Sequence, residues 1–278
     1  MKKISIIGGA GFVGTNFCRK LIKKKQHFEI IDLKKSREFP NNSKIGDVRN
    51  INDLRKMITG SIVVNLAAIH SDSVKDISQY YSTNVDGAVN LTKICTEKGI
   101  QKIIFTSSVA VYGFAKTKID VNGRIKPFND YGRSKFNAEE ILRSWQREGK
   151  NSLIIIRPTV IFGEGNRGNV YNLIKQVASG RFIMIGNGEN KKSISYVGNV
   201  AAFLEACLLS EKRYSIFNYV DNPNLKVNEL IRLIKTNLTG KDKIGLRLPI
   251  CFGLIIGHIA DTLSYLTGIK LPISKIRV

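Results

Sequence analysis

Tyr131 and Lys135 stand four residues apart, with Gly132, Arg133 and Ser134 between them. If this segment is helical, the two side chains lie on the same face, one turn apart. A phenol has a pKa of about 10 in water, and a neighbouring ammonium favours the phenolate and moves that pKa toward neutrality. The pair is therefore a candidate general base that takes a proton from a substrate hydroxyl.

A segment rich in hydroxyl groups lies upstream of this pair. Thr106, Ser107 and Ser108 follow the apolar residues 103–105. The pattern predicts a buried strand whose end carries the hydroxyls. A serine at such an edge, together with Tyr131 and Lys135, would provide the groups that a proton-transfer site needs.

A glycine-rich turn near the start of the chain predicts a dinucleotide site. The apolar residues 4–7 run directly into Gly8-Gly9-Ala10-Gly11-Phe12-Val13-Gly14. Strand, glycine turn and helix start together let a pyrophosphate approach backbone N–H groups at the helix N-terminus. Asp32 follows at the end of a second expected strand, where a carboxylate binds the adenosine ribose hydroxyls and repels a 2′-phosphate. The pattern thus predicts NAD rather than NADP.

The composition is that of a globular protein. The chain has 278 residues, of which 43% are hydrophobic and 24% charged, which excludes a disordered, collagen-like or low-complexity protein. It contains no apolar run of about eighteen residues that would span a membrane, and no signal peptide is visible. Four widely spaced cysteines, with no metal-binding pattern, are expected to be reduced core thiols in a cytoplasmic protein.

The net charge of +22 is the unusual feature of the composition. A cationic surface attracts nucleic acid, acidic lipid headgroups or phosphorylated substrates. The basic residues are spread along the chain, so a solvated lysine-rich surface is an equally good interpretation. The sequence has no recognisable motif for reading nucleic acid, and no such partner is expected.

Strands alternating with helices predict parallel βαβ units, and hence a Rossmann-like, doubly wound α/β sheet with a smaller C-terminal mixed α/β lobe. The expected strands are 4–7, 28–32, 61–68, 102–107 and 153–157, and the expected helices are 12–24, 53–58, 74–98 and 131–148. After about residue 163 the pattern changes to helices over 170–178, 198–209 and 227–238, with strands near 182–185 and 217–220. The predicted division is a dinucleotide-binding domain (1–165), a substrate-binding lobe (166–247) and a C-terminal segment (248–278).

Taken together, these motifs resemble those of the extended short-chain dehydrogenases/reductases, the NAD-dependent epimerase/dehydratase family. The resemblance covers residues 1 to about 240 and is carried by Gly8–Gly14, Asp32, Asp47-Val48, Asn65-Leu66-Ala67-Ala68, Ser108 with Tyr112-Gly113, Tyr131/Lys135, and Arg157-Pro158 before Phe162-Gly163. By this resemblance Ser108 would hold the reacting hydroxyl or keto oxygen and Tyr131 would move its proton. Lys135 would bind the nicotinamide ribose and tune Tyr131.

The resemblance also implies the residues that bind NAD. The pyrophosphate would lie on the glycine turn, and the adenosine and nicotinamide ends would lie against the segments that follow later strands. The implied NAD-binding residues are Gly8, Gly11, Phe12, Val13, Gly14, Asp32, Asp47, Val48, Leu66, Ala67, Ala68, Tyr131, Lys135 and Pro158. Asp47 and Val48 would contact the adenine.

The residues after Ser108 distinguish between activities of this family. The sugar 4,6-dehydratases carry an acidic pair at this point, whereas this chain has Val109 and Ala110. It therefore lacks the acid that would expel water. The resemblance then favours a 4-epimerase, an isomerase in which hydride leaves C4 for NAD⁺, the keto sugar turns over, and hydride returns to the other face.

Within the family, longer segments resemble the members that epimerise N-acetylglucosamine to N-acetylgalactosamine on undecaprenyl diphosphate for O-antigen and lipopolysaccharide synthesis. These segments include 103–113, 156–164, 166–173 and 196–199. Asn169 matches the asparagine that contacts the substrate diphosphate. Lys192 replaces a diphosphate-binding arginine, and a point charge in place of a planar fork weighs against a nucleotide carrier.

The C-terminal segment predicts an amphipathic helix. In a helix, Phe252, Ile256, Ile259, Leu263 and Leu266 would share one face, and His258, Asp261, Thr262 and Tyr265 the opposite one. Either the helix packs on the smaller lobe, or it lies in an anionic membrane interface. The second interpretation would place the protein on the inner face of the cytoplasmic membrane. His258 has no second ligand at metal spacing, so no metal is expected.

Three functions remain open from the sequence. The leading one is the lipid-diphosphate N-acetylhexosamine epimerase. The alternatives are a soluble epimerase of UDP-glucose or UDP-N-acetylglucosamine and a non-catalytic NAD(P)-binding protein. A homodimer through helices 74–98 and 131–148 is a further expectation from the family. The similar family members extend further, which leaves open whether the natural chain ends at Val278.

Overall fold

The computed structural model describes residues 2–70, 74–114, 117–180, 182–240 and 242–267. Its main strands are β1 (Ile4–Ile7), β2 (Phe28–Asp32), β3 (Ser43–Ile45), β4 (Ile62–Asn65), β5 (Lys102–Thr106), β6 (Ser152–Pro158) and β11 (Tyr214–Tyr219). They form one seven-stranded sheet in the order β11-β6-β5-β4-β1-β2-β3, and all neighbours are parallel. From β1 the chain adds β2 and β3 on one side of the sheet, and then returns to add β4, β5 and β6 on the other side. This reversal of the strand order confirms the predicted doubly wound α/β fold.

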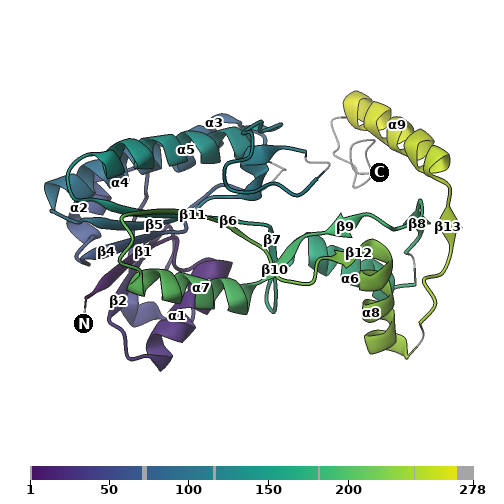
Figure 1. Cartoon of the computed structure of the whole chain (residues 1–278), viewed down its shortest axis with the longest axis horizontal. Coiled ribbons are helices and arrows are strands. Elements are labelled where there is room, and N and C mark those ends of the chain that lie inside the picture. The colour runs from purple at the N-terminus through teal and green to yellow at the C-terminus, as the bar shows by residue number, and fades with distance from the viewer. Residues whose placement is uncertain (1, 71–73, 115–116, 181, 241, 268–278) are drawn as a thin grey trace. The chain divides into compact units, whose positions relative to one another are not determined.

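Helices cover both faces of this sheet (Figure 1). On one face pack α2 (Ile51–Met57), α4 (Gly87–Glu97) and α5 (Asp130–Arg147), and on the other α1 (Phe12–Lys23) and α7 (Val197–Leu209). The inner strands are apolar along their whole length because both of their faces are covered. In β1 and β4, for example, all residues are buried.

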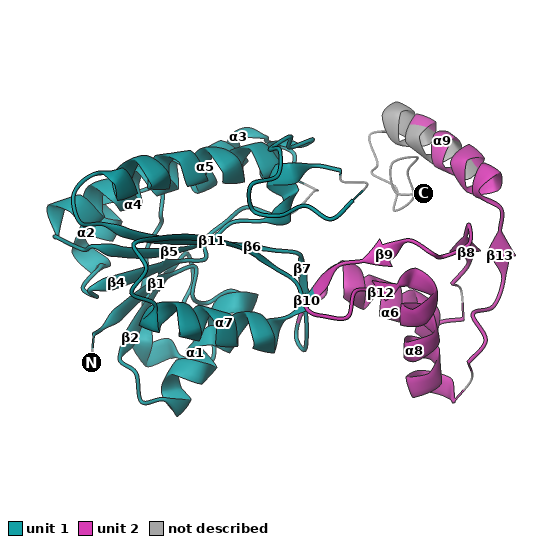
Figure 2. Ribbon diagram, in the orientation of Figure 1, with its two compact units in different colours: residues 1–165, 195–220 teal, residues 166–194, 221–278 magenta. Residues whose placement is uncertain are grey.

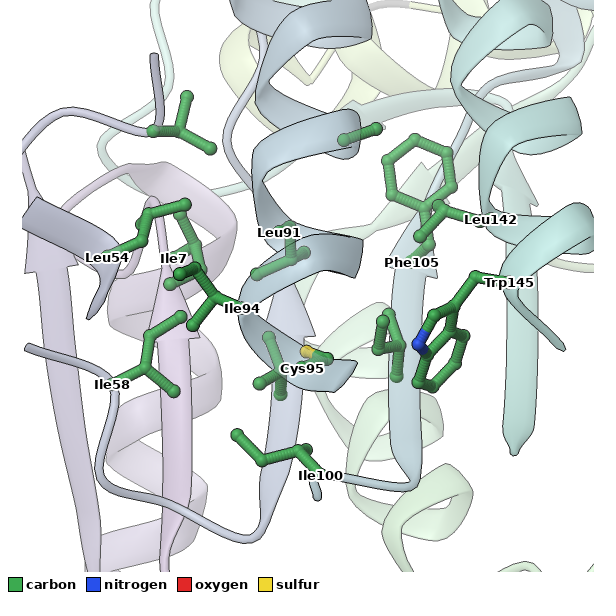
Figure 3. Close-up of a cluster of buried hydrophobic side chains, with 14 of the residues drawn as sticks. Ile7, Leu54, Ile58, Leu91, Ile94, Cys95, Ile100, Phe105, Leu142 and Trp145 are labelled. Atoms are coloured by element: carbon green, nitrogen blue, oxygen red, sulfur yellow. The ribbon is translucent and has the colours of Figure 1, made fainter. Parts of the chain in front are cut away.

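The core beneath α4 and α5 supports the edge of the sheet where the predicted site lies. Figure 3 shows Leu91 and Ile94 of α4 packed near Ile7 of β1, and Leu142 and Trp145 of α5 packed near Phe105 of β5. All of these side chains are at most 3% exposed. The position of α5, and hence of Tyr131 and Lys135, is therefore fixed by apolar packing against the strand that precedes Ser108.

Shorter elements complete this part of the chain. They are the 3₁₀ turn η1 (Pro40–Asn42), α3 (Ser78–Tyr80), the π-helical turn η2 (Tyr81–Asp86), the 3₁₀ turn η3 (Val109–Tyr112), and the paired strands β7 (Val160–Phe162) and β10 (Ile194–Tyr196). The expected helix over 74–98 therefore begins only at Ser78 and contains a π-helical turn. Strand β3 was not predicted, because Ser43–Ile45 has no apolar run that would indicate it.

The chain divides into two compact units, residues 1–165 with 195–220 and residues 166–194 with 221–278 (Figure 2). The predicted boundary after residue 165 coincides with the point where the chain first passes from the first unit to the second. The predicted assignment of residues 195–220 to the smaller lobe differs from the structure, because β11 pairs with β6 and α7 packs on α1. The expected strand at 217–220 is this same β11, and it begins earlier, at Tyr214.

The second unit has a small core of its own. It contains α6 (Asn169–Ala178), α8 (Val227–Thr239), α9 (Ile250–Thr267) and the paired strands β8 (Met184–Ile185) with β13 (Arg247–Leu248) and β9 (Lys191–Lys192) with β12 (Leu225–Lys226). The buried residues of its core are Val177, Met184, Ile231 and Ile244. This unit therefore has the mixed α/β composition expected of the smaller lobe.

The predicted C-terminal helix is α9, which begins at Ile250. Phe252 of the expected apolar face and His258 and Thr262 of the expected polar face are exposed. Ile250, Leu254 and Ile255 are also exposed, and Leu254 lies one turn before His258, so the first turns are apolar on more than one side. The side chains of the other residues assigned to the two faces lie outside the described residues. No helix in the described part of the chain is long and apolar enough to cross a membrane.

Three of the four cysteines, Cys18, Cys95 and Cys207, are buried free thiols, as predicted. Burial raises the pKa of Cys18 and Cys95 to about 12 and that of Cys207 to about 11, so these thiols stay protonated near neutral pH. The fourth, Cys251, is exposed at the start of α9, so its assignment to the core was wrong.

Candidate active site

The glycine turn after β1 meets the segment after β4 at the point where the strand order reverses. Gly8 has φ +77°, and a Cβ there would lie only 2.6 Å from the Ala67 nitrogen. The two segments are thus in backbone contact, and Leu66, Ala67 and Ala68 border the turn as half-buried residues. Ligands of doubly wound sheets bind in this crevice outside the carboxyl ends of the strands.

The N-terminus of α1 suits an anion. The helix follows Gly11, begins at Phe12, and has no acidic residue in its first turn. The Oδ2 of Asp32 accepts a hydrogen bond from the Ala10 nitrogen at 3.0 Å, so the carboxylate at the end of β2 lies against the glycine turn. The backbone crevice, the helix terminus and this carboxylate fit the pyrophosphate and ribose of NAD.

The residues predicted to contact adenine lie after β3. Asp47 accepts hydrogen bonds from the Arg49 side chain, which hold the pKa of its carboxyl below the usual value. Val48 is buried beneath α4, where its methyl groups fill the space beside Gly87. Pro158 is buried at the end of β6. Their contacts with NAD stay predictions.

Gly8→Ala is expected to abolish NAD retention. An alanine Cβ would collide with the Ala67 backbone, and φ +77° is unfavourable for any L side chain. The nucleotide extracted from purified protein measures the effect. Gly99→Ala is a matched control, because Gly99 has φ +64° with no atom within 4 Å of the added Cβ. Equal NAD content in the two variants would contradict the predicted role of Gly8.

Ser108 is the second residue after β5, which ends at Thr106, and so lies near the predicted strand end. It is the N-cap residue of η3, and its Oγ accepts a hydrogen bond from the Ala110 nitrogen at 3.1 Å. The side chain is half-buried. The hydroxyl group is therefore held at the carboxyl edge of the sheet, where the crevice lies.

Tyr131 lies in the first turn of α5, against η3. The helix is capped by Asn129, whose Oδ1 accepts from the Gly132 nitrogen at 2.9 Å. A Cβ on Gly132 would lie 2.5 Å from the Ala110 oxygen, so the helix start and η3 are in close contact. The structure thus brings together the segments that carry Ser108 and Tyr131. The half-buried ring of Tyr131 lies 6.4 Å from that of Tyr80, measured between centroids.

Lys135 is only 1% exposed, one turn after Tyr131. Its Nζ lies 4.2 Å from the centroid of the Phe105 ring. Burial lowers the pKa of Lys135 to about 7, although the nearby Glu139 carboxylate opposes this shift. A buried amine with such a pKa is suited to proton transfer near neutral pH.

Lys135→Met is expected to stabilise the protein while removing activity. Between pH about 7 and 10.5 the unfolded chain binds a proton at Lys135 that the folded chain does not, so this residue makes stability rise with pH there. Below pH 7 the folded protein carries the full free-energy cost of burying the charged Lys135 amine, and a methionine side chain removes this cost. We expect the free energy of unfolding to rise by at least about 1 kcal/mol at about pH 6. Denaturant titrations at low and high pH measure this, and a less stable variant at low pH would contradict it.

Sequence reasoning missed a buried ionic cluster beneath the site. Glu139, at 0% exposure in α5, is bonded by the Arg157 Nε at 2.8 Å and Nη2 at 2.5 Å. The Ser107 Oγ donates to its Oε1 at 2.5 Å, and the Arg143 Nη2 donates to its Oε2 at 2.7 Å. One carboxylate of α5 therefore joins the residue after β5 to Arg157 of β6, next to Ser108 in the chain and one turn after Lys135.

The cluster continues to β11 through Tyr112. The Tyr112 hydroxyl accepts a hydrogen bond from Arg157 at 2.5 Å and donates one to the Asn218 Oδ1 at 2.8 Å. Two signals in the sequence could have revealed it. Glu139 continues the four-residue spacing of Tyr131 and Lys135, and Arg157 is a charge within an otherwise apolar strand.

The two residues predicted to bind substrate diphosphate belong to the second unit. Asn169 is the exposed first residue of α6, and Lys192 is exposed in β9. Their contact with a substrate stays a prediction.

The comparisons with known proteins agree with this fold. The sequence pattern of the NAD dependent epimerase/dehydratase family matches residues 4–218. The chain therefore belongs to this family, whose members use NAD.

Particular relatives are sugar epimerases. The chain is 44% identical over 279 residues to N-acetyl-alpha-D-glucosaminyl-diphospho-ditrans,octacis-undecaprenol 4-epimerase of Escherichia coli O157:H7, which covers 99% of this chain and 84% of that protein. It is 26% identical to UDP-glucose 4-epimerase of Vibrio cholerae, covering 96% of this chain and 86% of that one. Its fold is similar to that of UDP-N-acetylglucosamine 4-epimerase from Bacillus cereus, with a TM-score of 0.79, 21% identity, and 90% and 86% of the two chains covered.

Proposed function

We propose that this protein is an NAD-dependent 4-epimerase of N-acetylhexosamine carried on undecaprenyl diphosphate, which interconverts N-acetylglucosamine and N-acetylgalactosamine for O-antigen synthesis. The observation that carries this proposal is the 44% identity over 99% of the chain to the lipid-linked sugar epimerase. The arrangement of Ser108, Tyr131 and Lys135 beside a dinucleotide crevice is what such a reaction needs.

The residues of the chain have separate tasks in this reaction. NAD supplies the reversible acceptance of hydride from C4 of the sugar. Ser108 holds the C4 oxygen, and Tyr131 removes its proton on oxidation and returns it on reduction. Lys135, one turn further along α5, tunes Tyr131 and binds the nicotinamide ribose. Asp32 selects NAD over NADP through the ribose hydroxyls.

Elimination of water is disfavoured at this site. A 4,6-dehydratase needs an acid that protonates the leaving hydroxyl, and Val109 and Ala110 of η3 provide none. The residues of η3 therefore favour oxidation and reduction at C4 without loss of water. Epimerisation needs only these two steps, so it requires no acid beyond Ser108, Tyr131 and Lys135.

A lipid carrier implies contact with a membrane, and α9 is our proposed point of contact. Ile250, Phe252, Leu254 and Ile255 are between 37% and 57% exposed there. Exposed apolar side chains in the first turns of α9, in a protein of net charge +22, suit an anionic interface on the cytoplasmic face. We propose peripheral association at that face, and a homodimer through α4 and α5 as the assembly.

The second candidate function is a UDP-hexose 4-epimerase, which the similarity to the Vibrio cholerae enzyme favours. Purified protein incubated separately with prenyl-diphosphate-GlcNAc and with UDP-GlcNAc distinguishes the two. The proposal predicts N-acetylgalactosamine from the lipid substrate, with kcat/KM at least about tenfold above that for the nucleotide sugar. Conversion of UDP-GlcNAc alone would support the second candidate.

A further inference from the structure

Two phenylalanine rings lie exposed beside the candidate active site. Phe114 and Phe128 are stacked, with centroids 4.3 Å apart and planes 25° from parallel. Yet Phe114 is 69% exposed and Phe128 51% exposed. A stacked aromatic pair with this much area in water is typical of a surface that binds an apolar partner.

The loop that carries this pair is attached to the site. Gly113 has φ +72°, and any Cβ there would overlap the Lys126 carbonyl, so the two ends of the loop are in close contact. The Lys126 nitrogen donates to the Val111 oxygen of η3 at 3.1 Å. Asn218 of β11 donates to the Ile119 oxygen, also at 3.1 Å. The buried cluster beneath the site thus also holds this loop.

Cations surround a hollow next to the Phe114 ring. The hollow has a volume of about 750 Å³, and Tyr112 and Ile119 line its apolar part. Lys118, Arg124 and Lys126 also line it, against the single carboxylate of Asp120. All three cations are exposed, so the hollow is suited to an anionic group.

The chain connects this surface to the reacting groups over a few residues. Tyr112 ends the turn η3, which begins after Ser108. Phe128 precedes Asn129, the N-cap of the helix that carries Tyr131. A ligand on this surface would therefore lie close to a sugar held between Ser108 and Tyr131.

We propose that Phe114, Phe128 and the three cations bind the prenyl-diphosphate carrier of the substrate. The cations would bind the diphosphate in addition to Asn169 and Lys192, whose contact with it stays a prediction, and the stacked rings would bind the first isoprene units. This inference rests on the proposed lipid-linked substrate. In a prenyl diphosphate an apolar chain follows the charged groups directly, as the exposed rings here lie directly beside the cations. In a nucleotide diphosphate a polar ribose follows the charged groups instead.

The test compares substrates of different chain length. GlcNAc diphosphate is prepared as its methyl, prenyl and farnesyl esters, and kcat/KM is measured for each with the wild type and with the double variant Phe114→Ala/Phe128→Ala. In the wild type we expect kcat/KM to rise with chain length, because each added isoprene unit buries apolar area. In the variant the ratio of kcat/KM for the farnesyl ester to that for the methyl ester should be at least about tenfold smaller than in the wild type. Leu209→Ala, which removes another exposed apolar side chain, is the matched control.

A second variant tests the charges. Lys118→Gln/Arg124→Gln/Lys126→Gln should raise KM for every ester and weaken its dependence on salt. Lys56→Gln/Lys150→Gln, at exposed positions of the same unit, should not. NAD content and the thermal midpoint report folding of each variant. An unchanged chain-length dependence in the phenylalanine variant would overturn this inference alone. A wild type that converts UDP-GlcNAc but no prenyl ester would overturn it together with the proposed function.

Discussion

Tyr131→Phe should lower kcat by about 10²–10⁴-fold, the usual effect of removing a general base. The substitution removes only the hydroxyl oxygen, so the ring keeps its place beside Tyr80 at the start of α5. Packing and NAD binding should therefore persist. The measurements are the rate of N-acetylgalactosamine formation on the lipid substrate, the NAD content and the thermal midpoint.

A matched control for this variant is Tyr214→Phe. Tyr214 is 42% exposed at the start of β11, so losing its hydroxyl should leave kcat unchanged. If Tyr131→Phe retained more than about a tenth of the wild-type rate, Tyr131 would not be the group that moves the C4 proton.

Glu139→Gln should destabilise the protein by about 3–5 kcal/mol, the cost of leaving a buried charge without its partner. Arg157 is 1% exposed, and its Nε and Nη2 both donate to the Glu139 carboxylate. The amide removes the compensating charge, and its NH2 group cannot accept the bonds that Arg157 and Arg143 donate to Oε2. The free energy of unfolding from denaturant titration measures the effect.

An exposed pair provides the control. Arg55 and Glu97 also form an ion pair, but each is 45% exposed. Glu97→Gln should therefore leave the stability nearly unchanged. The double variant Glu139→Leu/Arg157→Met should recover stability relative to Glu139→Gln, because no unpaired charge is then buried at Arg157. Equal losses from Glu139→Gln and Glu97→Gln would contradict a structural role for the cluster.

The sequence predicted those parts of the fold that local patterns define. The apolar run Ile4–Ile7 before Gly8 indicated β1 and the turn after it, because both signals lie within one short segment. The pairing of β6 with β11, at the edge of the sheet, could not be predicted in this way. Strand β11 is separated from β6 by the excursion of residues 166–194 into the second unit, and no local pattern records that return.

In the candidate site, too, local sequence patterns predicted some features, and others depend on tertiary contacts. The spacing of Tyr131 and Lys135 identifies a shared helix face directly. The bonds of Glu139 to Arg157 and Ser107, in contrast, join three elements that are distant in sequence. The lowered pKa of Lys135 also depends on burial, which spacing alone does not reveal. Side-chain types thus indicated which groups are candidates for the reaction, whereas their burial and hydrogen bonds depend on tertiary packing.

The central claim is that one carbon is inverted by oxidation and reduction within the same site. Prenyl-diphosphate-GlcNAc deuterated at C4 tests it most directly, with mass spectrometry of the product formed by purified protein without added reductant. If hydrogen leaves C4 and returns to it, the N-acetylgalactosamine keeps its deuterium. N-acetylgalactosamine that has exchanged the label for solvent hydrogen would contradict the claim.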